Sequence, residues 1–596
     1  MGKTLKVLGW LVGMLVVLII AAIVLVPMFV DLNDHKERII YEVKKETGRD
    51  LGINGEIGLS VFPHFALELN GLSLSNAKGF AGANFASVKH AEVRVNMIPL
   101  LFRQVLEVDT VQIDGLDLNL ARSKQGVTNW QDMLHGEKKA ATEVPETGGT
   151  GGEGGMLAFT VGGVAIDNAN VVWDDQVTGE HYKVENINLK TGELMPGQPV
   201  DVSFGMDLAS RKPQLKGKLA LTGRLLVDPA KQMFTLNNLD LNSDVTGEGL
   251  PEKGISAELK ANIKYDQGHD VLDVKGLNLS SGDLVLNGEI LGHDLRGDPQ
   301  LEGNLRLNQF SPRKWMQAFS LPLPAMADEH ALDSMEFSTN FTAGTGQVSL
   351  KQLLLKLDQT TLKGDMDVIT FANPGFLFTL KVDQIDLDRY LPPPAEGGAA
   401  PASGKSAAAS GNEELIPVEP LRKIRLDGTL SIDSLTVHNI HAEAVQLKLR
   451  ARNGKLSVDQ QIGRFYDGLQ KGTVNLDVSG KTPKLAVTQK LSRILAGPLL
   501  KDLMGDDKLT GSGDLDLNLT SQGGTLNQIK RTLDGNLSFD FTDGAVKGFN
   551  LAKMIRDARA RLSGEAAAVT NEPEQTDFSQ LTGKATITNG VVNNQQ

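Results

Sequence analysis

The sequence contains no cysteine among its 596 residues. That absence excludes disulfide bridges, thiolate metal sites and cysteine nucleophiles together. Aromatic residues make up only 5%, which leaves little material for bulky cores or for stacking platforms. A large basic block is missing as well, because 60 Lys and Arg face 73 Asp and Glu and the net charge is −13. Nucleic acid is therefore excluded as a partner, since phosphate contacts need clustered cations.

Long hydrophobic runs are also scarce, with one exception near the N-terminus. Val7 to Val26 is uncharged and almost wholly apolar, and a helix of this length spans roughly 30 Å. Lys3 and Lys6 precede the run, so the positive-inside rule places residues 1–6 in the cytoplasm. A cleaved signal peptide is the alternative, but the run is long for one and no A-x-A-like site follows it. We predict a single-pass transmembrane anchor over residues 7–30, with the rest of the chain in the periplasm if the membrane is a bacterial inner membrane.

What the sequence has in abundance is alternation of apolar and polar residues. Each run gives a strand one apolar and one polar face, which is typical of half-buried antiparallel strands. The clearest runs supply a candidate apolar lining: Leu116, Leu118, Leu120, Val474, Leu476, Val478, Leu515, Leu517, Leu519, Leu537, Phe539 and Phe541. The fold class predicted is mainly β: an N-terminal transmembrane helix followed by an elongated, curved antiparallel β-sheet, groove-like, with a few short helices.

Glycine is plentiful, at 63 residues, against a usual share of about 7%. Many strand-like runs begin with it, at Gly217, Gly288, Gly303, Gly364, Gly428, Gly472, Gly535 and Gly583. The intervals are irregular, so we interpret these glycines as turns or bulges between hairpins rather than as a solenoid repeat. Gly71 fits this interpretation, because Leu67-Leu69 and Leu72-Leu74 differ in parity and a bulge between them would restore a common face.

Helical signals are few. Asn33-Asp34 offers an N-cap to a short helix that Gly48 would end. Residues 313–319, 491–504 and 550–562 also look helical. The last of these carries four basic residues, Lys553, Arg556, Arg559 and Arg561, which could touch anionic lipid or simply form a charged outer face.

Two low-complexity segments, residues 136–155 and 392–412, divide the chain. The strand pattern resumes unchanged after each, so long loops on one sheet are favoured over domain boundaries. The predicted regions are a cytoplasmic tail at 1–6, the anchor at 7–30, an N-terminal β region with its leading helix at 31–135, a Gly-rich loop at 136–155, a middle β region at 156–391, a Pro/Ala/Gly-rich loop at 392–412 and a C-terminal β region at 413–596.

The search for catalytic and cofactor motifs finds none. His438 and His441 lie in a strand-like stretch, where positions three apart face opposite sides, so surface histidines are favoured over a metal pair. Two GK[ST] fragments lack the first glycine of a P-loop. The acidic cluster of Asp383, Asp386 and Asp388 lacks EF-hand spacing. We predict a protein that is not an enzyme and that uses no metal or cofactor.

The apolar strand faces must be covered by something. A closed sandwich would bury them internally, whereas an open curved sheet would expose an apolar trough that an acyl chain could occupy. Roughly 30–35 strands at about 4.8 Å would extend roughly 150 Å. The pattern alone leaves both architectures open.

Several fragments, in order, resemble the AsmA family, anchored envelope proteins that include TamB-like relatives. The fragments are Thr47-Gly48-Arg49, Ile53-Asn54-Gly55-Glu56, Pro63, Gly126–Trp130, Phe310–Phe319, Asp388–Pro392 and Thr588–Val591. The resemblance implies an inner-membrane-anchored periplasmic protein of outer-membrane biogenesis. It further implies an apolar β-groove that carries phospholipid between the membranes, and no catalytic residues.

Two further expectations follow from this resemblance. The alternative function is a non-conducting periplasmic scaffold that assists outer-membrane proteins or lipopolysaccharide, with a protein partner in the periplasm or outer membrane. Family members continue with further strands after the segment that ends at Val591, whereas this sequence ends at Gln596, so it is either truncated or ends unusually early, and a function that depends on the far end of the groove is not implied.

Overall fold

The computed structural model describes residues 32–60, 65–96, 107–134, 160–195, 197–369, 374–393, 415–563 and 572–595. Strands make up 63%, against about 20–25% in an average globular protein, and helices are few. The prediction of a mainly β fold is therefore confirmed. The described residues contain 28 strands, and the chain divides into two units, residues 1–291 with 318–320 and residues 292–317 with 321–596.

The predicted anchor over residues 7–30 lies outside the described residues. Within the described ranges, no helix has the length and apolar character needed to cross a membrane. The predicted short helix is present as η1 (Leu32–His35) and α2 (Lys36–Thr47), and Gly48 ends it with φ of 71°. Asn33 is not the N-cap, because its side chain exchanges hydrogen bonds with the backbone of Ile57 instead.

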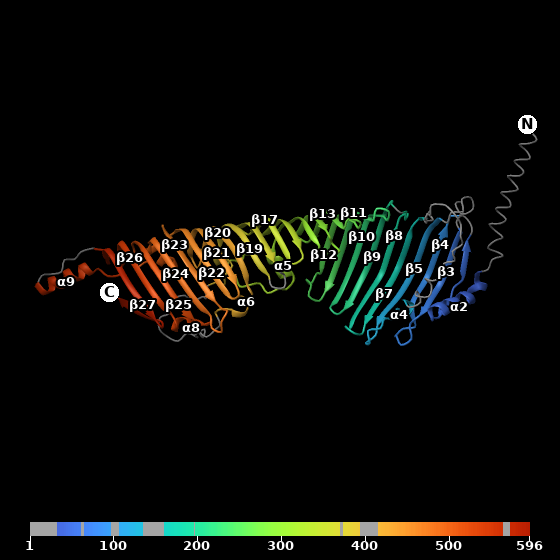
Figure 1. Ribbon diagram of the computed structural model, residues 1–596, viewed down its shortest axis with the longest axis horizontal. Coiled ribbons are helices and arrows are strands. Elements are labelled where there is room, and N and C mark those ends of the chain that lie inside the picture. The colour runs from blue at the N-terminus through green and yellow to red at the C-terminus, as the bar shows by residue number, and fades with distance from the viewer. Residues whose placement is uncertain are drawn as a thin grey trace, which may run out of the picture. The chain divides into compact units, whose positions relative to one another are not determined.

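In the first unit the strands follow one another in chain order (Figure 1). They are β1 (Leu51–Ile53), β2 (Ile57–Ser60), β3 (Phe65–Ser75), β4 (Asn84–Val95), β5 (Glu107–Arg122), β6 (Thr160–Val161), β7 (Val164–Asp175), β8 (Glu180–Thr191), β9 (Pro199–Arg211), β10 (Gln214–Asp228), β11 (Met233–Gly247), β12 (Ile255–Asp266) and β13 (Val271–Ser281), with the short helix α4 (Gln131–Leu134). Strand β14 (Leu284–His293) runs across the division between the units. From β7 to β13 each strand pairs antiparallel with the next.

The second unit is also built mainly of strands that follow one another along the chain. Its strands are β15 (Gln300–Phe310), β16 (Met335–Gly344), β17 (Gln347–Leu357), β18 (Thr360–Ile369), β19 (Gly375–Asp386), β20 (Arg425–Val437), β21 (Ile440–Arg452), β22 (Lys455–Phe465), β23 (Gly468–Asp477), β24 (Lys484–Leu495), β25 (Ser512–Gln522), β26 (Asp534–Lys547), β27 (Gln575–Thr588) and β28 (Val591–Gln595). Its helices are α5 (Pro312–Ala318), η2 (Leu387–Arg389), α6 (Val418–Lys423), α7 (Ala496–Met504), α8 (Leu526–Arg531) and α9 (Leu551–Ser563). The sheet is unclosed.

The sheet is mixed, which corrects the prediction of a purely antiparallel one. β5 pairs in parallel with β7, and β19 pairs in parallel with β20. Parallel neighbours need a connection that returns along the whole strand length, whereas antiparallel neighbours need only a short turn. Each of the two low-complexity segments falls in one of these two return connections.

The glycines have two structural roles. Gly71 has φ of 62°, and the register places both Leu69 and Leu72 opposite apolar residues of β4, as the parity argument predicted. Others lie inside strands, which the turn interpretation did not predict. Gly428 pairs with Phe378, and Gly583 pairs with Phe539. A Cβ at either position would lie 2.5 Å from the paired phenylalanine ring. The ring therefore occupies the space that a larger side chain at the glycine position would need.

Candidate functional site

One face of the second unit carries rows of apolar side chains that run from strand to strand. The register aligns Val458, Val474, Val487 and Leu519 across β22 to β25. A second row aligns Leu491, Leu515 and Phe539 across β24 to β26. Because paired residues point to the same side of a sheet, each of these two rows forms an apolar strip perpendicular to the strands. The row between them aligns Gln489, Leu517 and Leu537, so it is polar at β24.

The opposite face of the same strands is polar. On β25, Asp514, Asp516, Asn518 and Thr520 are exposed, while the leucines between them are half-buried. Asp516 forms an ion pair of 3.6 Å with Lys490 of the next strand. The alternation in the sequence thus separates a mainly apolar face from a charged one on these strands.

The first unit has a matching apolar face. Leu74, Ala86, Leu118, Val171, Val184 and Leu208 align across β3, β4, β5, β7, β8 and β9. Leu116 pairs with Val88, and Leu120 is aligned with Trp173. The structure therefore places all three candidate residues of β5 in apolar rows.

The remaining candidates belong to the second unit. Val474 and Leu476 lie on β23, Leu515, Leu517 and Leu519 on β25, and Leu537, Phe539 and Phe541 on β26. Phe541 is buried in a cluster with Val445, Ile494 and Ala496 near α7. Val478 follows the end of β23 and is fully buried, so it packs the end of the sheet rather than facing outward.

The apolar face of each unit is only partly covered by protein. Along β10, Leu215, Leu219 and Leu221 are half-buried and alternate with exposed residues, most of them polar. All 28 strands of the described residues belong to one sheet that does not close. A sandwich core would bury these leucines completely, as sheet-on-sheet packing does. The leucines retain exposed apolar surface that a ligand could cover.

A polar interruption in the apolar rows escaped the sequence analysis. Gln470 lies between Ile462 and Leu491 in the register and is only 6% exposed. Its Nε2 donates to Oε1 of Gln489, whereas its own Oε1 has no hydrogen-bond partner. The sequence feature that could have identified this residue is a glutamine at a position of the alternating run where an apolar residue is expected. The unpaired Oε1 of such a buried amide can accept a hydrogen bond from a bound ligand.

A buried arginine network, which the sequence analysis also missed, connects two of the fragments that carry the family resemblance. Arg49 is buried, and its guanidinium donates to both carboxylate oxygens of Asp132, at 2.6 and 3.2 Å. It also donates to the carbonyl of Asn129 and lies 4.8 Å from the centre of the Phe85 ring. Burial would raise the pKa of Asp132, but the hydrogen bonds and charge of Arg49 lower it below its usual range. This network fixes residues 126–132 against the strand end at Ser75.

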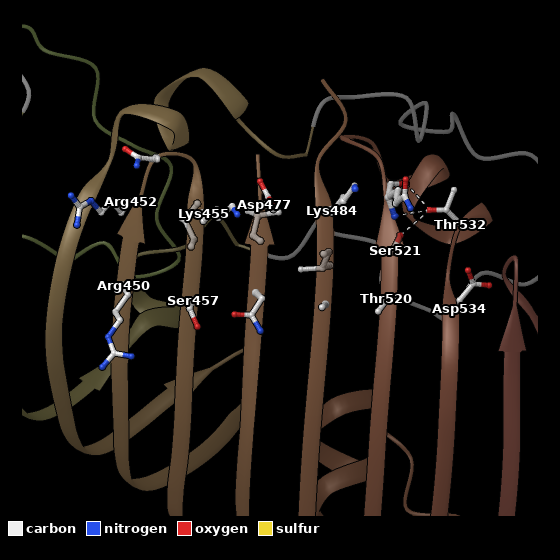
Figure 2. A pocket seen from close by; sticks show the side chains of 17 residues that line it. Arg450, Arg452, Lys455, Ser457, Asp477, Lys484, Thr520, Ser521, Thr532 and Asp534 are labelled. Atoms are coloured by element: carbon white, nitrogen blue, oxygen red, sulfur yellow. Dashed lines mark hydrogen bonds between the residues drawn. The ribbon is translucent and has the colours of Figure 1, made fainter. Parts of the chain in front are cut away.

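The polar face of the second unit contains a depression of about 730 Å³ (Figure 2). Arg452, Lys455 and Lys484 surround Asp477 there, on the neighbouring strands β21 to β24. Hydrogen bonds from the side chain and backbone of Ser479 lower the pKa of Asp477, with a further contribution from the two lysines. The depression is cationic at one end, but it lies on the face opposite the apolar rows.

The weak chemical motifs have structural roles. Asp388 accepts hydrogen bonds from the backbone N–H groups of His438 and Asn439, and Asp383 accepts one from Thr361. His438 occupies a turn with φ of 51°. In the part of the chain that the structure describes, no group of three or more His, Cys, Asp or Glu side chains could hold a metal ion.

Comparisons with known proteins identify the family. The AsmA family profile matches residues 1–596. The chain is 20% identical over 592 residues to Protein AsmA of Escherichia coli (strain K12), an alignment that covers 97% of this chain and 81% of that protein. No solved structure matches. Because the profile spans the chain from end to end, the chain belongs to the AsmA family.

Proposed function

We propose that this chain carries phospholipid along its apolar faces between the inner and outer membranes. In this proposal residues 7–30 anchor it in the inner membrane, residues 1–6 are cytoplasmic, and the bulk of the chain is periplasmic. Membership of the AsmA family and the open sheet fit a role in envelope biogenesis. The transport is non-covalent, so it requires no catalytic residue.

One observation carries the proposal. Rows of half-buried Leu, Val and Phe run from strand to strand in each unit, and a large exposed apolar surface of that kind supports the proposal of a binding site. Acyl chains suit such a surface because they have no polar groups to satisfy and gain about 25 cal/mol for each Å² of apolar area covered. Phosphate and headgroup would remain in water at the open side of the sheet.

The test uses the full chain in its native membranes. A photoreactive amino acid at Leu517, on the apolar face, is expected to crosslink to phospholipid that mass spectrometry identifies after purification. The matched position is Asp516, one residue away on the polar face, where lipid crosslinks should fall to background. Equal lipid recovery at the two positions, or none at either, would contradict the proposal.

Substitutions separate transport from folding. Leu517→Asp places a charge on the apolar face beside Leu537, so it should abolish function while the circular dichroism spectrum is retained, whereas Asp516→Leu should be tolerated. If crosslinking at Leu517 instead recovers one stoichiometric protein and no lipid, the non-conducting scaffold is the better assignment.

A further inference from the structure

Helix α9, which connects β26 to β27, is strongly amphipathic. Leu551, Met554, Ile555, Ala558 and Leu562 recur at spacings of three or four residues and so form one stripe along the helix. All of them are exposed: Met554 is 58% exposed and Leu562 is 88% exposed. A surface helix of a globular protein would turn such a stripe toward the core.

The orientation of α9 is the reverse of that arrangement. The half-buried positions of the helix are Lys553, Asp557 and Ala560, on the side opposite the apolar stripe. Figure 1 shows α9 projecting away from the strand ladder beyond β26. The polar side of the helix therefore faces the protein, and the apolar side faces outward.

Other exposed apolar side chains lie at the same end of the sheet. Leu503 and Met504, at the end of α7, and Phe549, just before α9, are all exposed. The segments that carry them are joined, because Lys547 forms an ion pair of 2.6 Å with Asp507. This end of the second unit thus presents a cluster of large apolar side chains.

The charge on α9 indicates what covers this cluster. The helix carries Lys553, Arg556, Arg559 and Arg561 against one acidic residue, in a chain whose net charge is −13. Arg556 pairs with Glu572. By helical spacing, Arg559 and Arg561 lie on either side of the apolar stripe, where they would meet phosphates as the stripe entered the acyl region.

We propose that α9, together with the end of α7, binds the surface of a bilayer that contains anionic phospholipid. The stripe enters the boundary between headgroups and acyl chains, and the flanking arginines contact the lipid phosphates. This contact is distinct from the proposed anchor at residues 7–30 and from the cargo face, and it does not require that the chain carry lipid. It gives the second unit a membrane contact of its own.

The absence of cysteine allows a clean test with the full chain. The variant Leu562→Cys, labelled with an environment-sensitive dye and reconstituted in phosphatidylcholine vesicles, is mixed with added vesicles. Added vesicles of phosphatidylcholine and phosphatidylglycerol should shift the emission to the blue, and added pure phosphatidylcholine vesicles should not. The matched label at Lys448→Cys, exposed on the polar face of β21, should remain unchanged with both.

Charge and apolar variants complete the test. Arg559→Gln together with Arg561→Gln should weaken vesicle binding about 25-fold, at about fivefold for each cation, and about 0.5 M salt should weaken it as well. Met554→Gln with Ile555→Gln should abolish the shift while circular dichroism is unchanged, because both side chains are exposed.

Three outcomes would overturn the membrane contact: no shift at Leu562→Cys with anionic vesicles, an equal shift at Lys448→Cys, or a shift without added vesicles that grows with protein concentration. The last would assign the stripe to a second copy of the chain. Lipid crosslinking at Leu517 is unaffected by any of them, so failure here is distinguishable from failure of the transport proposal.

Discussion

At the scale of single residues, the described polar side chains mainly fix strand ends and turns. Arg49 holds Asn129 and Asp132, while Asp358 accepts hydrogen bonds from three consecutive backbone N–H groups and from the hydroxyl of Tyr390. Such buried or half-buried hydrogen bonds to charged groups contribute about 1.5–3 kcal/mol each. These hydrogen bonds hold the connections between strands, and the charged groups that form them lie away from the apolar face.

The Arg49 network makes the first prediction. Arg49→Met keeps the aliphatic bulk but removes every guanidinium hydrogen bond, so it should lower the local stability of β3 to β5 by about 3 kcal/mol. Hydrogen exchange of residues 65–134 measures this loss. Arg38→Met, at an exposed position of α2, is the control and should leave exchange unchanged. Equal protection in the two variants would contradict a structural role for Arg49.

Two tyrosines give the second prediction. Burial, together with hydrogen bonds to Asp358 and Asp502 respectively, raises the pKa of Tyr390 and of Tyr466 to about 12. The unfolded chain loses these protons near pH 10, so the folded state binds more protons above that pH. The stabilisation is complete below pH of about 10 and is lost as pH rises toward about 12.

Denaturant unfolding across this alkaline range, with tyrosinate absorbance recorded in parallel, checks the sign. A double variant, Tyr390→Phe with Tyr466→Phe, lacks both titrating groups, so its free energy of unfolding should fall less steeply above pH of about 10. Parallel pH profiles for the two proteins would show that neither phenol is held neutral by the fold.

At the scale of elements, alternation was enough to predict the strands and the separation of their faces. Leu515, Leu517 and Leu519 are half-buried on β25 between exposed polar residues, as the pattern requires. Alternation carries no information on strand direction, however, so the parallel pairs β5–β7 and β19–β20 were not predicted. The local pattern also predicted one helix over residues 491–504. In the structure Leu491 still belongs to β24 and pairs with Leu515 of β25, and the helix α7 begins at Ala496.

The positions of the candidate residues on the sheet were predictable to a similar extent. Residues inside regular strands were placed in apolar rows, but Val478 lies past the end of β23, where alternation no longer applies. Gln470 was missed because its burial depends on Ile462 and Leu491 of the neighbouring strands. Both residues depart from the prediction because of packing between strands, which cannot be inferred from the sequence of one strand alone.

The glycines opposite phenylalanines give the third prediction. At Gly583 a new Cβ would lie 2.5 Å from Cζ of Phe539 and would displace that ring from the apolar face. Gly583→Ala should therefore cost about 1–3 kcal/mol of unfolding free energy. Gly480→Ala is the matched control, because a Cβ there meets nothing within 4 Å. Equal costs would mean that the Phe539 ring moves aside freely.

At the scale of the whole molecule, phospholipid bound to the apolar faces should raise the stability of the folded chain. A ligand that binds only the folded chain stabilises it by about 2.7 kcal/mol at a concentration of one hundred times Kd. The delipidated full chain should therefore unfold at a lower temperature than the chain purified with lipid, and added phospholipid should restore the difference. Glycerophosphocholine, which has the headgroup without acyl chains, should not restore it.

Two variants distinguish specific occupancy from general solubilisation by lipid. Leu517→Asp introduces a charge into the row where acyl chains would lie, so it should lose most of the thermal shift on adding phospholipid. Asp516→Leu alters the other face of the same strand and should keep the full shift. If both variants gain the same stabilisation as the unaltered chain, lipid acts at another surface, and the apolar rows of the second unit are not where the cargo binds.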